Sequence, residues 1–335
     1  MVMPIGAPNR FHSTKGSGSR NTQEKICLIV NPRAASGRAG AQIDKLKRLT
    51  DRAFEQWEIR LTEAPNHATE LAREAAETGF DLVAAVGGDG TCHEVVNGLF
   101  LDGKPIRRQT AFTVIPFGTG SDLVRSLQIP KNTQEALWIA ATGLSLPSDL
   151  GWAEVTTDKG LHREAFINVA SFGASAAVAR RVNEGSKRFG GTASFMSATL
   201  KTLFNYSPSP VTIEFSNEKD EKHWSNQLMA GFIANGHYCG SGMHVGPNGS
   251  MQDGLFDICM FEPTPLSHQL IDLRHLYDGQ IAHSRGITTA QASTIVAKSD
   301  APVFIELDGE TRGMLPAKFD IQKSAITLRG GWTKV

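Results

Sequence analysis

The apolar residues in the first half of the chain form short continuous runs, and each run ends in a polar or glycine-rich loop. Three such runs are Ile26–Val30, Leu82–Val86 and Thr110–Ile115. Their length and composition are typical of strands that are buried on both faces. Trp57–Thr62 alternates between apolar and polar residues, as a half-buried strand does. The pattern therefore predicts four strands in this half.

Segments with helical spacing follow these strands. We expect helices at about 39–54, 66–78, 91–99 and 123–127. Strands that alternate with helices predict an α/β N-terminal domain with a mostly parallel, doubly wound sheet. Such sheets bind ligands where their strands end, which is where the loops after Val30, Val86 and Ile115 lie.

From about Leu146 the pattern changes to short strands with few helices between them. The expected strands are Trp152–Thr156, Ala165–Ala170, Val211–Phe215, Gln227–Ala234, Phe256–Phe261, Val303–Leu307 and Ala325–Leu328. Helical intervals are expected at 174–183, 192–204 and 266–280. Strands that follow one another with turn residues between them predict a C-terminal antiparallel β-sandwich domain.

These patterns divide the chain into three parts. We predict a disordered tail at residues 1–24, because it is polar and rich in glycine and serine. An α/β domain then occupies 25–145 and a β-rich domain 146–328. The expectation leaves open that the extreme C-terminus packs back on the first domain.

Composition narrows the class of protein. The chain has 335 residues, with 34 basic and 34 acidic side chains, so its formal net charge is zero. This balance gives no reason to expect a nucleic-acid partner. The four cysteines are scattered without paired spacing, which predicts buried thiols in a reducing compartment. No apolar stretch approaches the roughly 18 residues of a membrane span, and the first residues lack a signal-peptide core. We expect a cytoplasmic protein.

The most informative segment is Leu82–Leu99, which reads as a strand, a glycine turn and a helix. Glycines there favour positive φ and let a ligand approach the backbone, and Thr91 with Glu94 has the spacing of a capping box. The helix N-terminus attracts an anion. Asp89 among the glycines indicates a Mg²⁺-bound phosphate or a hydroxyl that loses its proton. The alternative is a tight turn in which Asp89 has no chemical role.

The sequence Gly87-Gly88-Asp89-Gly90-Thr91 resembles the GGDGT motif of diacylglycerol, sphingosine, ceramide and bacterial lipid kinases, and more distantly of NAD kinases and phosphofructokinases. Asn31-Pro32 through Gly37 resembles the NPxSG opening of the lipid kinase catalytic domain. Thr62 followed by His67-Ala68 resembles a further motif of this family, in which the threonine lies near the nucleotide. Pro116 through Asp122 resembles PxGTxND, with Ser121 in place of the usual asparagine.

The second half resembles the same family in the same order. Asp149-Leu150-Gly151 is similar to the start of its second domain, and Asn168 through Gly173 to its next motif. Asn235 through Asp257 resembles the NG…P…DGLLD run. Asp308-Gly309-Glu310 resembles the late DGE triplet, although Asp-Gly alone is also a common hairpin turn. On these motifs the chain is identified as a member of the diacylglycerol kinase and bacterial lipid kinase family.

This resemblance implies a lipid kinase that transfers the γ-phosphoryl group of ATP to a lipid hydroxyl. Residues 25–145 then form the nucleotide-binding catalytic domain, and 146–328 the lipid-substrate domain. The nucleotide-binding residues implied are Asn31, Thr62, Gly87, Gly88, Asp89, Gly90, Thr91, Gly118 and Thr119. Two acids are candidates for the base that accepts the hydroxyl proton. We favour Glu310 for this role and assign Asp89 to the Mg²⁺ and phosphates, while the reverse assignment stays open.

The family also implies a structural Mg²⁺, held by Asp253 and by the backbone carbonyls of Ser250 and Leu255. The expected partner is a lipid at a membrane surface, reached by peripheral association without a transmembrane segment, and a homodimer is left open. A NAD kinase-like enzyme is the nearest rival. The other alternative is a nucleotide-binding regulatory protein without turnover, and Ser121 is the only residue that supports it.

Overall fold

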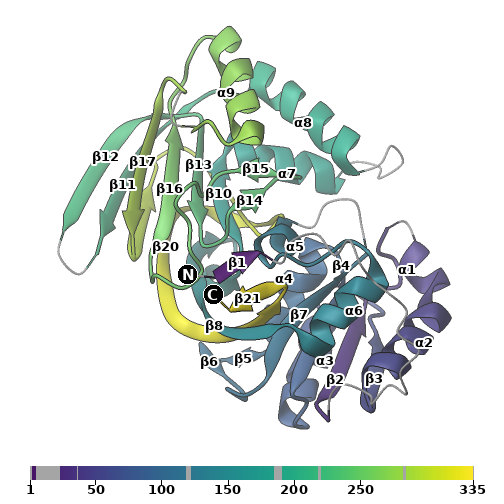
Figure 1. Ribbon diagram of the computed structural model, residues 1–335. Coiled ribbons are helices and arrows are strands. Elements are labelled where there is room, and N and C mark those ends of the chain that lie inside the picture. Colours follow the sequence, from purple (N-terminus) through teal and green to yellow (C-terminus); the bar gives the residue numbers. More distant parts are fainter. Residues whose placement is uncertain are drawn as a thin grey trace. The chain divides into compact units, whose positions relative to one another are not determined.

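The computed structural model describes residues 2–4, 23–35, 37–117, 122–184, 191–217, 220–281 and 284–334. The chain divides into two compact units (Figure 1). The first contains residues 1–148 and 325–335, and the second contains 149–324. The last eleven residues thus return to the first unit.

The first unit is built on a parallel sheet. Its strands, in spatial order, are β3 (Gln56–Leu61), β2 (Lys25–Val30), β4 (Leu82–Gly87), β7 (Ala111–Pro116) and the end of β20 (Glu310–Gly330). All four pairings are parallel. Every residue of β4 and β7 is buried, as expected of central strands covered on both faces. The prediction of a parallel α/β domain is confirmed.

Six helices are described in this unit: α1 (Arg38–Ala41), α2 (Ile43–Ala53), α3 (His67–Glu77), α4 (Asp89–Gly98), α5 (Asp122–Ser126) and α6 (Thr133–Thr142). The helix expected at 39–54 is interrupted at Gln42, whose backbone leaves helical geometry. Helix α6 was not expected. Its start is marked by Asn132, whose side chain accepts hydrogen bonds from the N–H groups of Gln134 and Glu135.

Short strands complete the first unit. β5 (Phe100–Leu101) and β6 (Lys104–Pro105) form a hairpin. β1 (Val2–Pro4) pairs antiparallel with β21 (Trp332–Lys334). Our expectation of a disordered tail at residues 1–24 differs from the structure at β1. It also differs at Glu24, whose carboxylate forms an ion pair with Arg329. The part of this tail at residues 5–22 lies outside the described residues.

The second unit is an antiparallel β-sandwich, as predicted. One layer has the order β17 (Ile287–Ala292), β16 (Phe256–Phe261), β13 (Ala230–Ala234), β10 (Val169–Gly173), β19 (Phe304–Leu307) and β20. The other strands are β8 (Leu144–Thr157), β9 (Gly160–Phe166), β11 (Ser209–Ser216), β12 (Glu221–Leu228) and β18 (Thr294–Lys298). Phe166, Phe172, Phe256 and Phe319 are fully buried between the layers.

Three helices and one small hairpin are added to this sandwich. The helices are α7 (Ala174–Glu184), α8 (Gly191–Asn205) and α9 (Leu266–Asp278), which gather on one side of the second unit (Figure 1). The hairpin consists of β14 (Tyr238–Cys239) and β15 (Met243–His244). α7 follows β10 directly, and Gly173 between them has φ +85°, a conformation that favours glycine.

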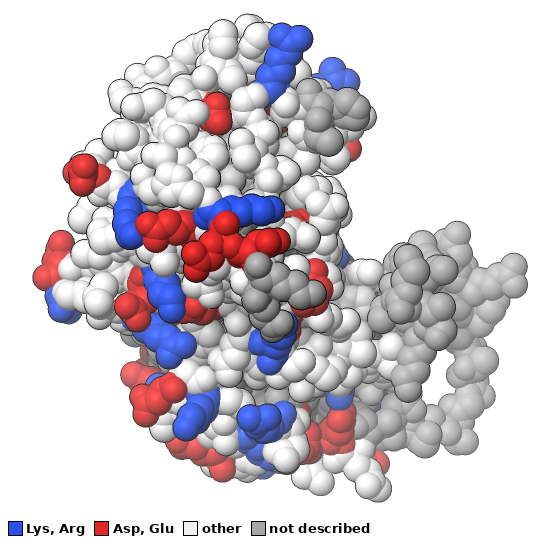
Figure 2. Space-filling view, turned by 90° about the vertical axis from the view of Figure 1, so that its left-hand side faces the viewer, with Lys and Arg blue, Asp and Glu red and all other residues white. Residues whose placement is uncertain are grey.

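Charges of both signs alternate on the face of the molecule shown in Figure 2, and no wide area of a single sign appears there. Exposed ion pairs of the second unit include Lys298 with Glu214 at 2.8 Å and Lys318 with Asp320 at 2.9 Å. Among the described residues, no helix combines the length and apolar character needed to cross a bilayer.

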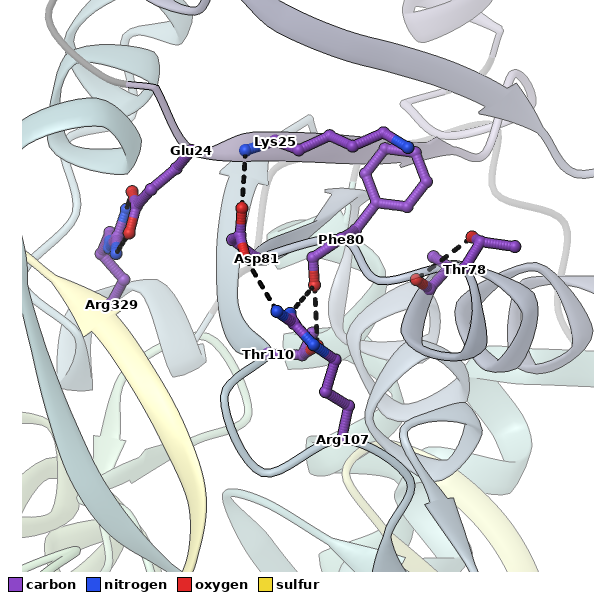
Figure 3. Close-up of polar contacts among 9 residues, drawn as sticks. Glu24, Lys25, Thr78, Phe80, Asp81, Arg107, Thr110 and Arg329 are labelled. Carbon is purple, nitrogen blue, oxygen red and sulfur yellow. Dashed lines mark hydrogen bonds and ion pairs between the residues drawn. The ribbon is translucent and has the colours of Figure 1, made fainter.

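A polar network fastens the amino-terminal edge of the parallel sheet (Figure 3). The carboxylate of Asp81 accepts hydrogen bonds from the backbone N–H of Lys25 and from the guanidinium of Arg107, each at 3.0 Å. Arg107 and Thr110 also donate to the carbonyl of Phe80, at 2.8 and 2.7 Å. Burial alone would raise the pKa of Asp81, but the bonds from Lys25 and Arg107 outweigh it and hold the pKa below its usual range.

We expect Asp81→Asn to lower the free energy of unfolding by about 1 kcal/mol at neutral pH, because two hydrogen bonds to a carboxylate are weakened. An acid whose pKa is lowered on folding contributes fully above its unfolded pKa of about 3.9, and the contribution is lost as the pH falls through the folded pKa. Urea unfolding at pH 7 and pH 3 measures this. The exposed Asp158→Asn is the control. An equal difference at both pH values would contradict the assignment.

Candidate functional site

Four strands end next to one another at the carboxyl-terminal edge of the parallel sheet. The N–H of Asn31 donates to the carbonyl of Val86 at 3.1 Å, and that of Phe117 donates to Gly87 at 3.1 Å. On the other side, the N–H of Thr62 donates to Val30 at 2.9 Å. The strand ends after β3, β2, β4 and β7 are thus joined in one row. Asn31, Thr62 and the Gly87 turn lie together at this edge, although they are far apart in the sequence.

Thr91 occupies the centre of this row. Its hydroxyl accepts a hydrogen bond from the side-chain amide of Asn31 at 3.4 Å. It also lies directly against Gly87, where a Cβ atom would be only 2.4 Å from the Thr91 hydroxyl oxygen. A side chain at Gly87 would displace Thr91. Gly87 is therefore needed for close packing, while a Cβ at Gly88 would meet open space.

The prediction of a capping box formed by Thr91 and Glu94 is wrong. Helix α4 begins at Asp89 with Gly88 as its N-cap, so Thr91 lies inside the helix. Glu94 caps a different helix, because its carboxylate accepts a hydrogen bond from the N–H of Ala68 at 3.2 Å, in the first turn of α3. The expectation of positive φ in this turn is also wrong, since Gly87, Gly88 and Gly90 all lie outside that region. The close approach of α4 to the strand fixes both features.

The first turn of α4 lies at this edge of the sheet. Gly88 has no side chain to cap it, and the first intrahelical hydrogen bond runs from Cys92 N–H to the Gly88 carbonyl at 3.1 Å. The N–H groups of Asp89, Gly90 and Thr91 precede that bond and lie at the positive end of the helix dipole. Asp89 is half-buried in this first turn. The arrangement combines backbone donors for an anion with one carboxylate.

Part of the predicted nucleotide site falls on Gly118, Thr119 and Ser121, which lie outside the described residues. The flanking residues are described. Pro116 ends β7 at the same edge as Gly87. Asp122 is buried at the first position of α5. The pairing of Pro116 with Gly87 places the start of this loop beside the α4 turn.

In the second unit, Asp308, Gly309 and Glu310 form the hairpin turn between β19 and β20. Asp308 and Gly309 have φ of +49° and +95°, and Leu307 pairs with Glu310 across the turn. The Asp308 carboxylate is buried and accepts three backbone hydrogen bonds, from Ile167 and Asn168 at 2.9 Å and from Val169 at 3.2 Å. Asp308 therefore holds the turn against β10, while Glu310 is half-buried at the start of β20.

Asp253 lies in a turn before β16. Its carboxylate accepts a hydrogen bond from the N–H of Leu255 at 2.9 Å. Partial burial raises the pKa of Asp253, and the nearby charges of Asp149 and Asp257 raise it further. Within the described part of the chain, no three His, Cys, Asp or Glu side chains form a metal-binding group. The donors at this turn are one carboxylate and the backbone carbonyls of residues such as Ser250.

Sequence reasoning did not assign a role to Asp149. Its buried carboxylate accepts hydrogen bonds from the N–H of Gly254 at 2.7 Å and of Ser324 at 2.8 Å. It thus joins the Asp253 turn to Ser324 of β20 within the second unit. Sequence reasoning also missed Glu306, a buried acid next to the Asp308 turn. Its signal was a charged residue inside the apolar strand Val303–Leu307.

Comparison with known proteins follows this division of the chain. Residues 25–153 match the family model of the diacylglycerol kinase catalytic domain. Residues 168–330 match the model described as the YegS C-terminal NAD kinase beta sandwich-like domain. The two matched segments correspond closely to the α/β unit and the β-sandwich.

Whole-chain relatives agree with these matches. The chain is 27% identical over 293 residues to a diacylglycerol kinase of Bacillus subtilis (strain 168), covering 87% of this chain and 91% of that protein. It is 29% identical over 271 residues to the "Probable lipid kinase YegS-like" of Klebsiella pneumoniae (strain 342), covering 81% and 85%. A solved structure described as "A putative diacylglycerol kinase from Bacillus anthracis str. Sterne" superposes with a TM-score of 0.73 at 26% identity, covering 92% and 97%.

Proposed function

The chain belongs to the diacylglycerol kinase family of lipid kinases, and from this premise we propose that it transfers the γ-phosphoryl group of ATP to the hydroxyl of a lipid. The observation that carries the proposal is the carboxyl edge of the parallel sheet, where Asn31, Gly87 and Thr91 meet at the N-terminal turn of α4. Backbone N–H groups and a helix dipole are suited to phosphate groups. The family implies that the acceptor is a lipid.

The first unit binds the nucleotide in this proposal. The N–H groups at the start of α4 bind phosphate oxygens, and Asn31 holds the Thr91 hydroxyl in place. Thr62, at the end of β3, lies on the same edge. Gly118 and Thr119 complete the nucleotide-binding set that the family resemblance implies. Asp89 is assigned to the Mg²⁺ that accompanies ATP, because a carboxylate beside phosphates needs a cation between them.

The second unit supplies the base. We assign Glu310 to accept the proton of the lipid hydroxyl, whose oxygen then forms a bond to the γ-phosphorus as the bond to ADP breaks. The half-buried side chain of Glu310, at the start of a strand held by Asp308, supports this choice. Asp308 itself is committed to three backbone N–H groups and is not available as a base. Asp89 remains the alternative base.

We also propose that the Asp253 turn holds a structural Mg²⁺. Desolvation is the main cause of the raised pKa of Asp253, and the negative charges of Asp149 and Asp257 add to it; a divalent cation would offset those charges. The carboxylate of Asp253 and the carbonyls of Ser250 and Leu255 are the hard oxygen donors that Mg²⁺ prefers, with waters completing the shell. Bound there, the ion would neutralise this charge and fix the turn before β16.

We expect Mg²⁺ to raise the melting temperature of the wild type by about 5 °C at saturating concentration, because a ligand that binds only the folded state stabilises it. Asp253→Ala should abolish that rise. The raised pKa means that the ionised carboxylate is unfavourable without a cation, so the variant should be no less stable in EDTA. Melting curves with and without Mg²⁺, in the absence of ATP, measure both effects. An identical Mg²⁺ response in Asp253→Ala would reduce Asp253 to a turn residue.

The acceptor is tested with a panel of lipids in mixed micelles. Diacylglycerol, a sphingoid base, ceramide and phosphatidylglycerol are each incubated with Mg²⁺ and γ-labelled ATP, and the lipid products are separated by thin-layer chromatography. Label in one lipid class identifies the acceptor. Label in none of them, with label in NAD, would favour the NAD kinase-like alternative. ATP binding without any transfer would favour a regulatory protein.

A further inference from the structure

Glu306 is a buried acid in the strand that leads into the Asp308 turn. It is 9% exposed, and its neighbours in β19, Ile305 and Leu307, are completely buried. A carboxylate in such a strand is costly unless hydrogen bonds satisfy it. One oxygen of Glu306 accepts a hydrogen bond from the hydroxyl of Ser171, at 2.5 Å. The other accepts one from the backbone N–H of Gly309.

These two bonds connect the turn to the sheet. Ser171 lies on β10, directly opposite Glu306 in the antiparallel pair of β10 and β19. Gly309 is the residue before Glu310. The Glu306 side chain therefore connects Ser171 on β10 to the peptide that precedes Glu310. Asp308 holds the other side of the same turn through its bonds to residues 167–169.

We propose that Glu306, with Ser171, is a positioning residue that fixes the Asp308–Glu310 turn and so determines where the Glu310 carboxylate lies. This inference rests on the proposed function, in which Glu310 is the base. A base must lie within hydrogen-bond reach of the proton that it takes. Displacement of a reacting group by about 1 Å costs on the order of a hundredfold in rate.

Glu306 is placed to hold the turn and not to react. Both of its oxygens accept hydrogen bonds from the protein, and it is almost completely buried. Glu310, by contrast, is half-buried and begins the strand beyond the turn. The role of Glu306 is therefore geometric, and it should not depend on its charge.

Two substitutions at this position separate geometry from charge. In Glu306→Gln, the side-chain carbonyl can still accept from Gly309, and the amide can donate to Ser171, because a hydroxyl accepts as well as donates. In Glu306→Ala, both links are lost. We expect kcat to fall about a hundredfold in Glu306→Ala and less than about fivefold in Glu306→Gln. In Ser171→Ala, which removes one link, kcat should fall about tenfold. The KM for ATP should not change in any of them.

The rates are measured with γ-labelled ATP and mixed micelles of total bacterial lipid extract. Glu154→Ala, at an exposed glutamate of the same unit, is the control, and melting curves test folding. Equal losses in Glu306→Gln and Glu306→Ala would mean that the charge is needed and would overturn the inference. So would wild-type kcat in Glu306→Ala. If Glu306→Ala does not fold, Ser171→Ala decides, since an unchanged kcat there would also overturn it.

Glu310→Gln separates this inference from the proposed function. Full turnover in Glu310→Gln would remove the assigned base and leave nothing for Glu306 to position. An inactive Glu310→Gln together with a fully active Glu306→Ala would keep the proposed function and reject only the positioning role.

Discussion

Asp89→Asn is expected to lower the maximal rate of phosphoryl transfer about a thousandfold while the protein stays folded. Asp89 lies in the first turn of α4, beside the N–H groups that we assign to the phosphates. Asparagine has the same size but lacks the charge that holds Mg²⁺ against them. Asparagine is also tolerated near a helix N-terminus, so the cost in stability should stay below about 1 kcal/mol. Initial rates and a melting curve measure the two effects.

The binding of Mg²⁺–ATP distinguishes the two roles proposed for Asp89. If Asp89 holds the cation, calorimetry should show that Asp89→Asn binds Mg²⁺–ATP more weakly. If Asp89 is the base, binding should be unchanged while turnover is lost. Asp102→Asn is the matched control, because Asp102 is exposed on the hairpin of β5 and β6 in the same unit. Near-normal turnover in Asp89→Asn would reject both roles.

Glu310→Gln should lower kcat between about a hundredfold and ten-thousandfold, which is the range that general base catalysis contributes. Glutamine has the same shape as glutamate but does not accept the proton of the lipid hydroxyl. The KM for ATP should not change, because the residues that we assign to the nucleotide belong to the first unit. Melting curves should match the wild type, since Asp308 and Glu306 hold the turn without Glu310.

Glu154→Gln, on an exposed part of β8, controls for the loss of a negative charge from the second unit. Wild-type kcat in Glu310→Gln, combined with a loss in Asp89→Asn at unchanged Mg²⁺–ATP affinity, would transfer the role of base to Asp89.

The parallel sheet could be predicted from the sequence because each of its strands has a recognisable local pattern. Leu82–Val86 and Thr110–Ile115 are short apolar runs with a loop and a helix behind them, and they became β4 and β7. The same periodicity located α3. It failed at α2, where one expected helix is divided at Gln42. Periodicity reports which face is buried and does not reveal a local break of this kind.

The contacts of the candidate site could be predicted only in part. The loops at Asn31, Thr62 and Gly87 follow from their places at strand ends. The hydrogen bond between Asn31 and Thr91 could not be predicted, because Asn31 lies 60 positions earlier in the sequence. Thr91 makes this bond in place of the expected capping box. The two carboxylates that hold the Glu310 turn bond to residues 135 to 141 positions away. Such contacts depend on the register of β10 with β19, which no local pattern specifies.

The most direct test of the account is the transfer of labelled phosphate from ATP to lipid. The wild type and Glu310→Gln are incubated with γ-labelled ATP, Mg²⁺ and either total bacterial lipid extract or NAD, and the reaction is partitioned between chloroform and water. We predict label in the chloroform phase with wild type and lipid extract, at a rate at least about a hundredfold above that of Glu310→Gln, and no label in NAD. A wild-type protein that labels NAD, or that labels neither acceptor, would contradict the assignment as a lipid kinase.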